Sequence, residues 1–232
     1  MGFWRKLFGL KEKSYSPQGK PRRPSGEWWR EGVNPQVADS WEVAETLFQA
    51  QQWEQAWQAY ENITVTIDQM ESPITTPELM AMIGVRQAAV LLRLNRAEEA
   101  EVYLDRSGAA ATAVRQDQLR PHNLFDYHTT FAEMCAARQD EVRLGFAGNN
   151  ALKISLHYLR DIEKTCQVIK LWLDALIAME EWWQVNRVIA QVKLLIPTQG
   201  LSFNDSQRLT TLLSPYAQLL QEKSIEPHTP ES

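Results

Sequence analysis

Hydrophobic residues recur at helical spacing along most of the chain. One such stripe comprises Trp53, Ala56, Tyr60 and Ile63. Between residues 168 and 177, apolar side chains cover nearly every helical face, which is typical of a helix surrounded by other helices. No stretch alternates between polar and apolar residues as a half-buried strand would. The pattern therefore predicts an all-α protein.

Asparagine and proline mark the expected starts and ends of several helices. Asn34 followed by Pro35 is a typical cap and first-turn pair. Pro77 is expected to open another helix, which Asn95 ends. Pro121 is expected to begin the first helix of the second half of the chain.

Further glycines and prolines predict interruptions in that second half. Gly145 and Gly148 indicate a break, after which a new helix begins at residue 149 or 150. Pro197 is expected to end the helix that begins at Trp182. Pro215 is expected to kink or end the last helix, because proline removes a backbone hydrogen bond.

A repeated order of small and large residues underlies these helices. A small residue and a large residue on one helix are followed by a large, a small and another large residue on the next. Small residues let two antiparallel helices approach closely, and the large residues fill the gaps between pairs. The residues expected to pack in this way are Ala44, Leu47, Trp53, Ala56 and Tyr60, then Ala88, Leu91, Ala100 and Leu104, then Leu176, Trp182, Val185, Ile189 and Pro197.

The spacing of the copies supports a repeat. Ala56 and Ala100 are 44 residues apart and Val185 follows after 85, so a degenerate unit is expected near residue 143. This pattern resembles the tetratricopeptide repeat family over about residues 36–197, although the period exceeds that family's 34 residues. The resemblance implies antiparallel helix pairs stacked as a short tetratricopeptide-like α-solenoid, with a concave surface that binds a protein or peptide partner. Trp41 and Glu45 lie near the places where that family grips a terminal carboxylate, so no such clamp is expected.

The sequence divides into four regions. Residues 1–13 are predicted to be a basic amphipathic helix, residues 14–34 a flexible Pro-rich linker, residues 35–222 the helical domain and residues 223–232 a disordered tail. The residues of the first region expected to bind a membrane or partner are Phe3, Trp4, Arg5, Lys6, Leu7, Phe8, Lys11 and Lys13.

Charge is unevenly distributed between the beginning of the chain and the remainder. Residues 1–30 hold eight Lys and Arg against two Glu, a net charge of +6, whereas the remainder holds 16 basic and 27 acidic residues, a net charge of −11. The basic region could bind an anionic membrane surface, the acidic body of the same chain or another protein. In the alternative hypothesis the arm binds nucleic acid, with phosphate and stacking contacts from Lys20, Arg22, Arg23, Trp28 and Trp29.

The sequence gives little support to catalysis or to metal binding. His128 and Cys135 could share a helical face, but no metal-binding motif accompanies them, so a buried imidazole and a buried thiol are expected. We expect no cofactor, no metal and no enzymatic activity. Only two cysteines are present, which favours a reducing compartment. The expected location is therefore the cytoplasm, with peripheral attachment to the inner face of a membrane. Of Trp182 and its neighbour Trp183, one is expected to lie in the core and the other at the surface or in a groove, and a role in packing alone is favoured for the pair.

Overall fold

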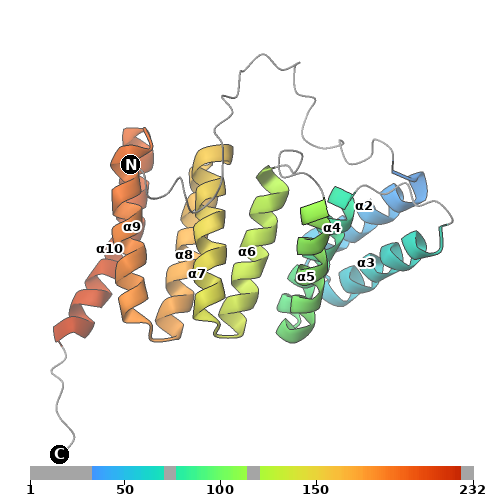
Figure 1. Ribbon diagram of the computed structural model, residues 1–232, viewed down its shortest axis with the longest axis horizontal. Helices are drawn as coiled ribbons and strands as arrows, with labels where there is room; N and C mark the ends of the chain where they lie inside the picture. The colour runs from blue at the N-terminus through green and yellow to red at the C-terminus, as the bar shows by residue number, and fades with distance from the viewer. Residues whose placement is uncertain (1–32, 71–76, 114–120, 226–232) are drawn as a thin grey trace, which may run out of the picture.

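The computed structural model describes residues 33–70, 77–113 and 121–225, and every regular element in these ranges is a helix. Figure 1 shows them as a row along the long axis of the molecule. The elements are α2 (Pro35–Gln49), α3 (Trp53–Asp68), α4 (Pro77–Arg93), α5 (Ala97–Ala113), α6 (Pro121–Ala137), α7 (Glu141–Lys153), the π-helix η2 (Ile154–Leu159), α8 (Ile162–Ala178), α9 (Trp182–Thr198) and α10 (Phe203–Ile225). The all-α prediction is confirmed for these residues. No helix among them is long and apolar enough to cross a lipid bilayer.

Two of the predicted regions lie mainly outside the described residues. The helix predicted over residues 1–13 falls there entirely, as do residues 14–32 of the predicted linker. At the other end, α10 continues through residues 223–225, which the sequence pattern assigns to the tail.

Four helix pairs are joined by the same type of turn. The residue in the left-handed conformation is Gln51, Asn95, Gln139 or Glu180, with φ between 55° and 60°. In each turn this residue donates its N–H to the carbonyl three positions back, and the next residue donates to the carbonyl five positions back. This is the Schellman arrangement, which satisfies the last carbonyls of the first helix. The turns recur after 44, 44 and 41 residues, so the pairs α2–α3, α4–α5, α6–α7 and α8–α9 follow the predicted spacing.

The turns locate the degenerate unit that was expected near residue 143. Counted from Gln139, the positions of Ala44, Leu47 and Ala56 in the first pair correspond to Ala132, Cys135 and Leu144. All six positions are occupied by apolar side chains, and five of them are at most 1% exposed, Leu47 being half-buried. The α6–α7 pair therefore keeps the packing positions although it lacks the aromatic residues of the first pair.

The predicted break around two glycines is wrong. Helix α7 runs without interruption through Gly145 and Gly148, and it begins at residue 141, where the Asp140 carboxylate accepts a hydrogen bond from the backbone N–H of Arg143 at 3.0 Å. Gly148 serves close packing, because a Cβ built there would lie 2.7 Å from Cδ2 of Trp172 on α8. Nothing lies within 4 Å of the corresponding position at Gly145.

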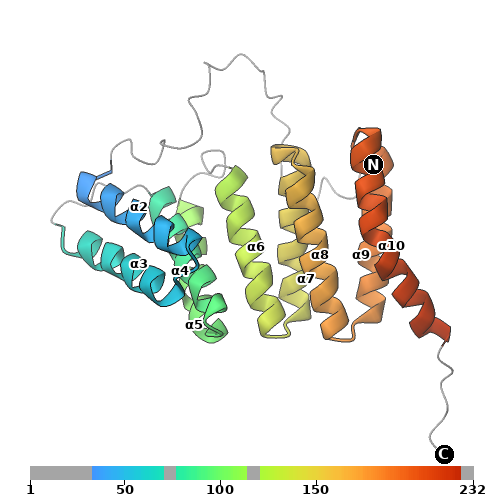
Figure 2. The same cartoon turned by 180° about the vertical axis from the view of Figure 1, so that it is seen from behind.

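Two prolines lie inside helices in the C-terminal part of the described chain. Pro197 lies in the last turn of α9, which ends one residue later, close to the predicted end. Pro215 lies inside α10, which continues to residue 225, so the predicted end at this proline is wrong. Figure 2 shows that α10 instead changes direction part-way along its length, the expected response to a missing hydrogen bond and a ring clash.

The main contacts among the described helices join elements that are near in the chain. Within each pair the two helices are in contact, and the second helix of a pair also packs against the first helix of the next pair. Among the first helices, α6 lies between α4 and α8, and α8 contacts α10. Two hydrophobic clusters result, one centred on α2, α3 and the start of α4, and one extending from α4 to α10. Trp57 packs against both clusters and so joins them.

Polar side chains connect equivalent helices of neighbouring pairs. Among the second helices, the Tyr103 hydroxyl donates to Glu61 at 2.9 Å and the Gln191 amide donates to Asn149 at 2.9 Å. Among the first helices, the Tyr216 hydroxyl on α10 donates to Asp174 on α8 at 2.6 Å. In all three contacts the partners are 42 residues apart, so one period of the sequence corresponds to one step along the row.

We predict opposite effects of adding one methyl group at the two glycines of α7. Gly148→Ala should destabilise the protein by about 1–3 kcal/mol, because the rigid Trp172 ring must move. Gly145→Ala should be neutral or stabilise the protein by up to about 1 kcal/mol, because alanine favours the helix and meets open space. Urea unfolding of both variants measures the difference, and equal effects would contradict the described packing.

Candidate functional site

Arg86 on α4 connects the first helices of three consecutive pairs. Its Nε donates to the Glu45 carboxylate on α2 at 2.8 Å, and its Nη1 lies 3.6 Å from Oδ2 of Asp126 on α6. The guanidinium carbon also lies 5.1 Å from the centre of the Phe48 ring. The Arg86 side chain is 24% exposed, so solvent screens these contacts only in part. Arg86 therefore fixes the positions of α2, α4 and α6 relative to one another.

The protonation states around Arg86 are fixed by its neighbours. Tyr60 on α3 donates its hydroxyl to the same Glu45 carboxylate at 2.6 Å. Burial, with Glu45 as the second cause, raises the pKa of Tyr60 far above its ordinary value. Burial opposes the charge on Arg86, but Glu45 and then Asp126 outweigh it, so the pKa of Arg86 is raised. Tyr60 and Arg86 therefore hold their protons throughout the physiological range, which suits them to binding and positioning.

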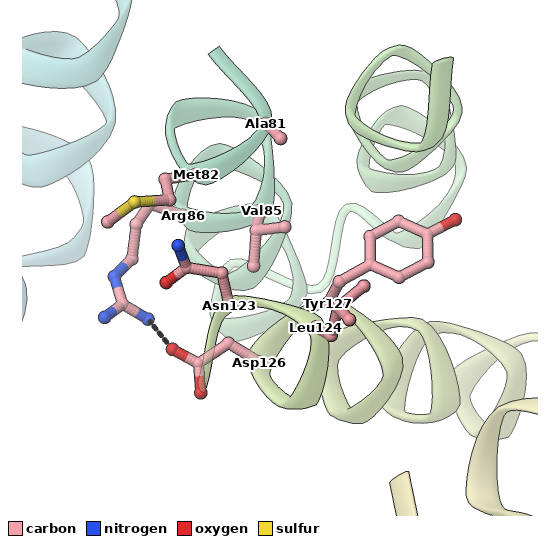
Figure 3. Close-up of a pocket in the computed structure, with 8 residues that line it drawn as sticks. All are labelled: Ala81, Met82, Val85, Arg86, Asn123, Leu124, Asp126 and Tyr127. Atoms are coloured by element: carbon pink, nitrogen blue, oxygen red, sulfur yellow. Dashed lines mark ion pairs between the residues drawn. The ribbon is translucent and has the colours of Figure 1, made fainter. Parts of the chain in front are cut away.

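A small pocket lies beside Arg86, between α4 and α6 (Figure 3). Figure 3 shows Arg86 and Asp126 pointing toward each other, with the side chains of the two helices around the pocket. The lining residues are Ala81, Met82, Val85 and Arg86 from α4 and Asn123, Leu124, Asp126 and Tyr127 from α6. Its volume of about 30 Å³ is enough for one or two water molecules or the tip of a side chain.

A second, more open depression lies between α8 and α10. Its volume is about 610 Å³, and its lining combines the exposed ion pair of Arg208 and Glu163 with the side chains of Cys166 and Leu212. Burial raises the pKa of the Cys166 thiol, so this sulfur is a poor nucleophile at neutral pH. The depression offers polar and apolar contact area but no activated group.

His128 and Cys135, the two side chains considered for catalysis, are buried, and burial disfavours the charged form of each. Burial lowers the pKa of His128 to about 4, and its Nδ1 is buried without a hydrogen-bond partner. Rings of Tyr127 and Phe146 flank the imidazole edge-on, with centroids 5.2 and 6.1 Å away. Burial also raises the pKa of Cys135 to about 11. Within the described ranges, no three His, Cys, Asp or Glu side chains come together as metal ligands.

Exposed apolar side chains lie on the second helices of two neighbouring pairs. On α7, Val142 and Phe146 are one turn apart and are 81% and 55% exposed. On α9, Trp183 is 68% exposed, and the Arg187 guanidinium carbon lies 5.6 Å from the centre of its ring. Trp183 is therefore the tryptophan of the pair that lies at the surface, as expected for one of the two, whereas Trp182 is half-buried. The (i, i+1) spacing on a helix places the two rings on different faces.

The residues predicted to pack between helices occupy three environments. Those that are fully or almost fully buried are Ala44, Ala56, Tyr60, Ala88, Leu91, Ala100, Leu104, Leu176, Val185 and Ile189. Leu47, Trp53 and Trp182 are half-buried, and Pro197 is exposed. The predicted membrane- or partner-binding residues, from Phe3 to Lys13, lie outside the described residues.

The sequence drew attention to Glu45 only because it lies near a place where tetratricopeptide repeats bind a terminal carboxylate, which an acidic residue cannot do. Sequence reasoning missed Arg86, which lies 41 residues away and pairs with Glu45. The available signal was the opposite charge at nearly one period of separation, which becomes informative only when the period is known. Comparisons with family models, with curated proteins and with solved structures each found no match.

We predict that His128 makes the protein sensitive to mild acid. Its pKa is about 4 in the folded chain and has the ordinary value of 6.5 in the unfolded chain, so the unfolded chain binds the proton more readily between these values. The contribution of neutral His128 to stability is therefore present above pH 6.5 and is lost as the pH falls toward 4.

Lowering the pH from about 7 to about 4.5 should cost wild type about 2 kcal/mol more than it costs His128→Leu. Urea unfolding at the two pH values measures this difference. His157→Gln is the matched control, because it removes another histidine whose pKa is lowered, by burial and then by the charge of Lys153. It tests whether the pH dependence belongs to His128. The same pH dependence in wild type and His128→Leu would contradict the assignment.

Proposed function

We propose that the protein is a non-catalytic adaptor of the tetratricopeptide-like type. In this proposal its helix pairs stack as a short α-solenoid. A partner protein or peptide binds along the face formed by the first helices α2, α4, α6 and α8, which corresponds to the concave face of such solenoids. The basic residues 1–13 attach the adaptor reversibly to an anionic membrane surface in the cytoplasm.

The contact of Arg86 with both Glu45 and Asp126 carries this proposal. It joins three consecutive first helices through one guanidinium, whose pKa is raised by its two carboxylate partners. A face held in this way loses little conformational freedom when an extended partner segment binds across it. The repeated polar contacts between second helices support the same rigid arrangement from the other side.

The pocket between α4 and α6 supplies an anchor point on this face. Its walls include Ala81, Met82 and Val85, which favour an apolar side chain of the partner. Met82 is flexible and can move to admit a larger group. Asn123 and Asp126 at the same pocket offer polar groups to the partner backbone. The proposed ligand is therefore an extended segment with one apolar anchor residue.

Membrane attachment rests on the composition of residues 1–13. Each cation near an anionic surface contributes about 1 kcal/mol, so the four Lys and Arg less Glu12 contribute about 3 kcal/mol. Insertion of Phe3, Trp4 and Leu7 into the interface adds to this, and ordering of the segment subtracts from it. The balance favours reversible attachment, which suits an adaptor that moves between a membrane and a partner.

We predict that one substitution in the pocket removes partner binding. In Met82→Glu, a charged side chain at the mouth of the pocket excludes an apolar anchor, and partner capture should fall about tenfold or more. Quantitative affinity capture from an extract of the native cells compares this variant with the wild-type full chain.

Val102→Glu is the matched control, because Val102 is 48% exposed on α5, a second helix. It places the same charge on the opposite row of helices and should leave capture unchanged. If Met82→Glu captures the same proteins in the same amounts as wild type, the proposed binding face is wrong. Unfolding curves of both variants show whether a loss of capture reflects a loss of folding.

A further inference from the structure

The negative charge of the described helices is concentrated on the first pair. Residues 33–70, which contain α2 and α3, hold six Asp and Glu and no Lys or Arg, a net charge of −6. Residues 77–113 hold five acidic and four basic residues, and residues 121–225 hold eleven and ten, so each range has a net charge of −1. The remaining pairs are therefore almost neutral, and the first pair differs from all of them.

The segment that precedes this pair has the opposite charge. Residues 1–32 hold eight Lys and Arg against three Glu, a net charge of +5. The two most strongly charged parts of the chain are thus adjacent in sequence and opposite in sign. A surface patch and a segment of complementary charge attract each other over about a Debye length, roughly 10 Å at moderate salt.

The first pair also presents exposed side chains that nothing in the packing of the row uses. Asp39 on α2 and Asp68 on α3 are exposed. Each helix also exposes a valine, Val43 at 59% and Val65 at 49%. Glu61 and Glu45 instead face the next pair, where Glu61 accepts hydrogen bonds from Tyr103 and Gln87 and Glu45 pairs with Arg86.

The position of α2 and α3 leaves one side of the pair at the end of the row. Figures 1 and 2 show the pair as the last unit at one end, and α3 packs against α4 on its inner side. The basic segment joins the first pair directly, because α2 begins at Pro35. A random coil of 32 residues would have a typical end-to-end distance of about 30 Å, and the 16-residue helix α3 is roughly 24 Å long, so a chain of this length can reach along the whole pair.

We propose that residues 1–32 dock on the exposed acidic surface of the first helix pair, α2–α3, of the same chain. The Lys and Arg side chains face carboxylates that include Asp39 and Asp68, and the apolar residues Trp4 and Phe8 cover the exposed valines. Because the segment is tethered, its local concentration at this surface is roughly millimolar, so weak individual contacts are sufficient. An anionic membrane or a partner must then compete with α2–α3 for the same cations.

This contact is tested in the full chain by limited trypsin digestion at low ionic strength. Trypsin cleaves after Lys and Arg unless proline follows, and residues 1–30 hold eight of these residues, of which Lys20 and Arg23 precede proline. Docking shields the remaining sites, so a docked segment is cleaved slowly. The test variant combines Asp39→Asn, Glu42→Gln and Asp68→Asn, which removes three charges from α2–α3 without changing any trypsin site. Intact-mass measurement follows the first cleavage within residues 1–30.

The control variant combines Glu98→Gln, Glu180→Gln and Glu222→Gln, three exposed acids outside the first pair. Glutamine already occupies the position equivalent to Glu180 in two other turns, at Gln51 and Gln139. We expect cleavage in the test variant to be about five- to tenfold faster than in wild type, the effect of three exposed charge contacts. The control variant should match wild type, and high salt should raise the wild-type rate toward that of the test variant.

Three results would overturn the proposal. Equal cleavage rates in wild type and the test variant would show that the acidic surface does not hold the segment. Protection that increases with protein concentration would show docking on a second copy. Protection that arises only after addition of vesicles containing anionic lipid would show that a membrane, and not α2–α3, is the occupant. Partner capture through Met82 is independent of all three results.

Discussion

The packing of each helix pair against the next is the interaction on which the rest of the described structure depends. No pair can bury its hydrophobic surface alone, and the contacts run between elements that are close in the chain. Small residues at equivalent places, such as Ala44, Ala88 and Ala132, are at most 1% exposed and bring the helices together. Where this position holds a larger residue, Leu173, it is also fully buried.

Buried apolar contacts bring the pairs together, and polar contacts at one period of separation set how they are aligned. The contact of Glu45 with Arg86 aligns the first two pairs, and that of Arg86 with Asp126 continues this to α6. On the other row, Glu61 and Tyr103 provide the equivalent link. The contacts of Arg86 join first helices, which form the proposed binding face, whereas the contact of Glu61 with Tyr103 joins the second helices behind it.

Much of the helical arrangement could be predicted from the sequence because it depends on local signals. Asn34 accepts the capping hydrogen bond from Gln36 at 2.9 Å, as the Asn-Pro pair indicated. Gly148 was misread because its role depends on Trp172, which lies 24 residues away in the chain and packs against it only in the folded protein. The helix through Pro215 likewise depends on tertiary packing, since buried Leu209 and Leu213 hold α10 in place before the proline.

The candidate site was harder to predict than the fold. A single arginine such as Arg86 carries no sequence signal of its own, and its two acidic partners are 41 and 40 residues away. The π-helix η2 also lacked a signal, because its six residues have an ordinary helical composition. The exposure of Trp183 follows from the direction in which α9 packs, which the apolar pattern alone leaves open. The recurrence of the turns explains the contacts of Arg86 with Glu45 and Asp126, because it places residues about one period apart on neighbouring pairs.

A double-mutant cycle on Glu45→Gln and Arg86→Met tests most directly whether consecutive pairs are held together in this way. Urea unfolding of wild type, the two single variants and the double variant should give a coupling energy of about 1–3 kcal/mol, because the two side chains are in contact and partly buried. The exposed pair Lys170 and Asp174 within α8 is the control, with an expected coupling of about 0.3–0.5 kcal/mol. A coupling between Glu45 and Arg86 no larger than that of the control would contradict the account.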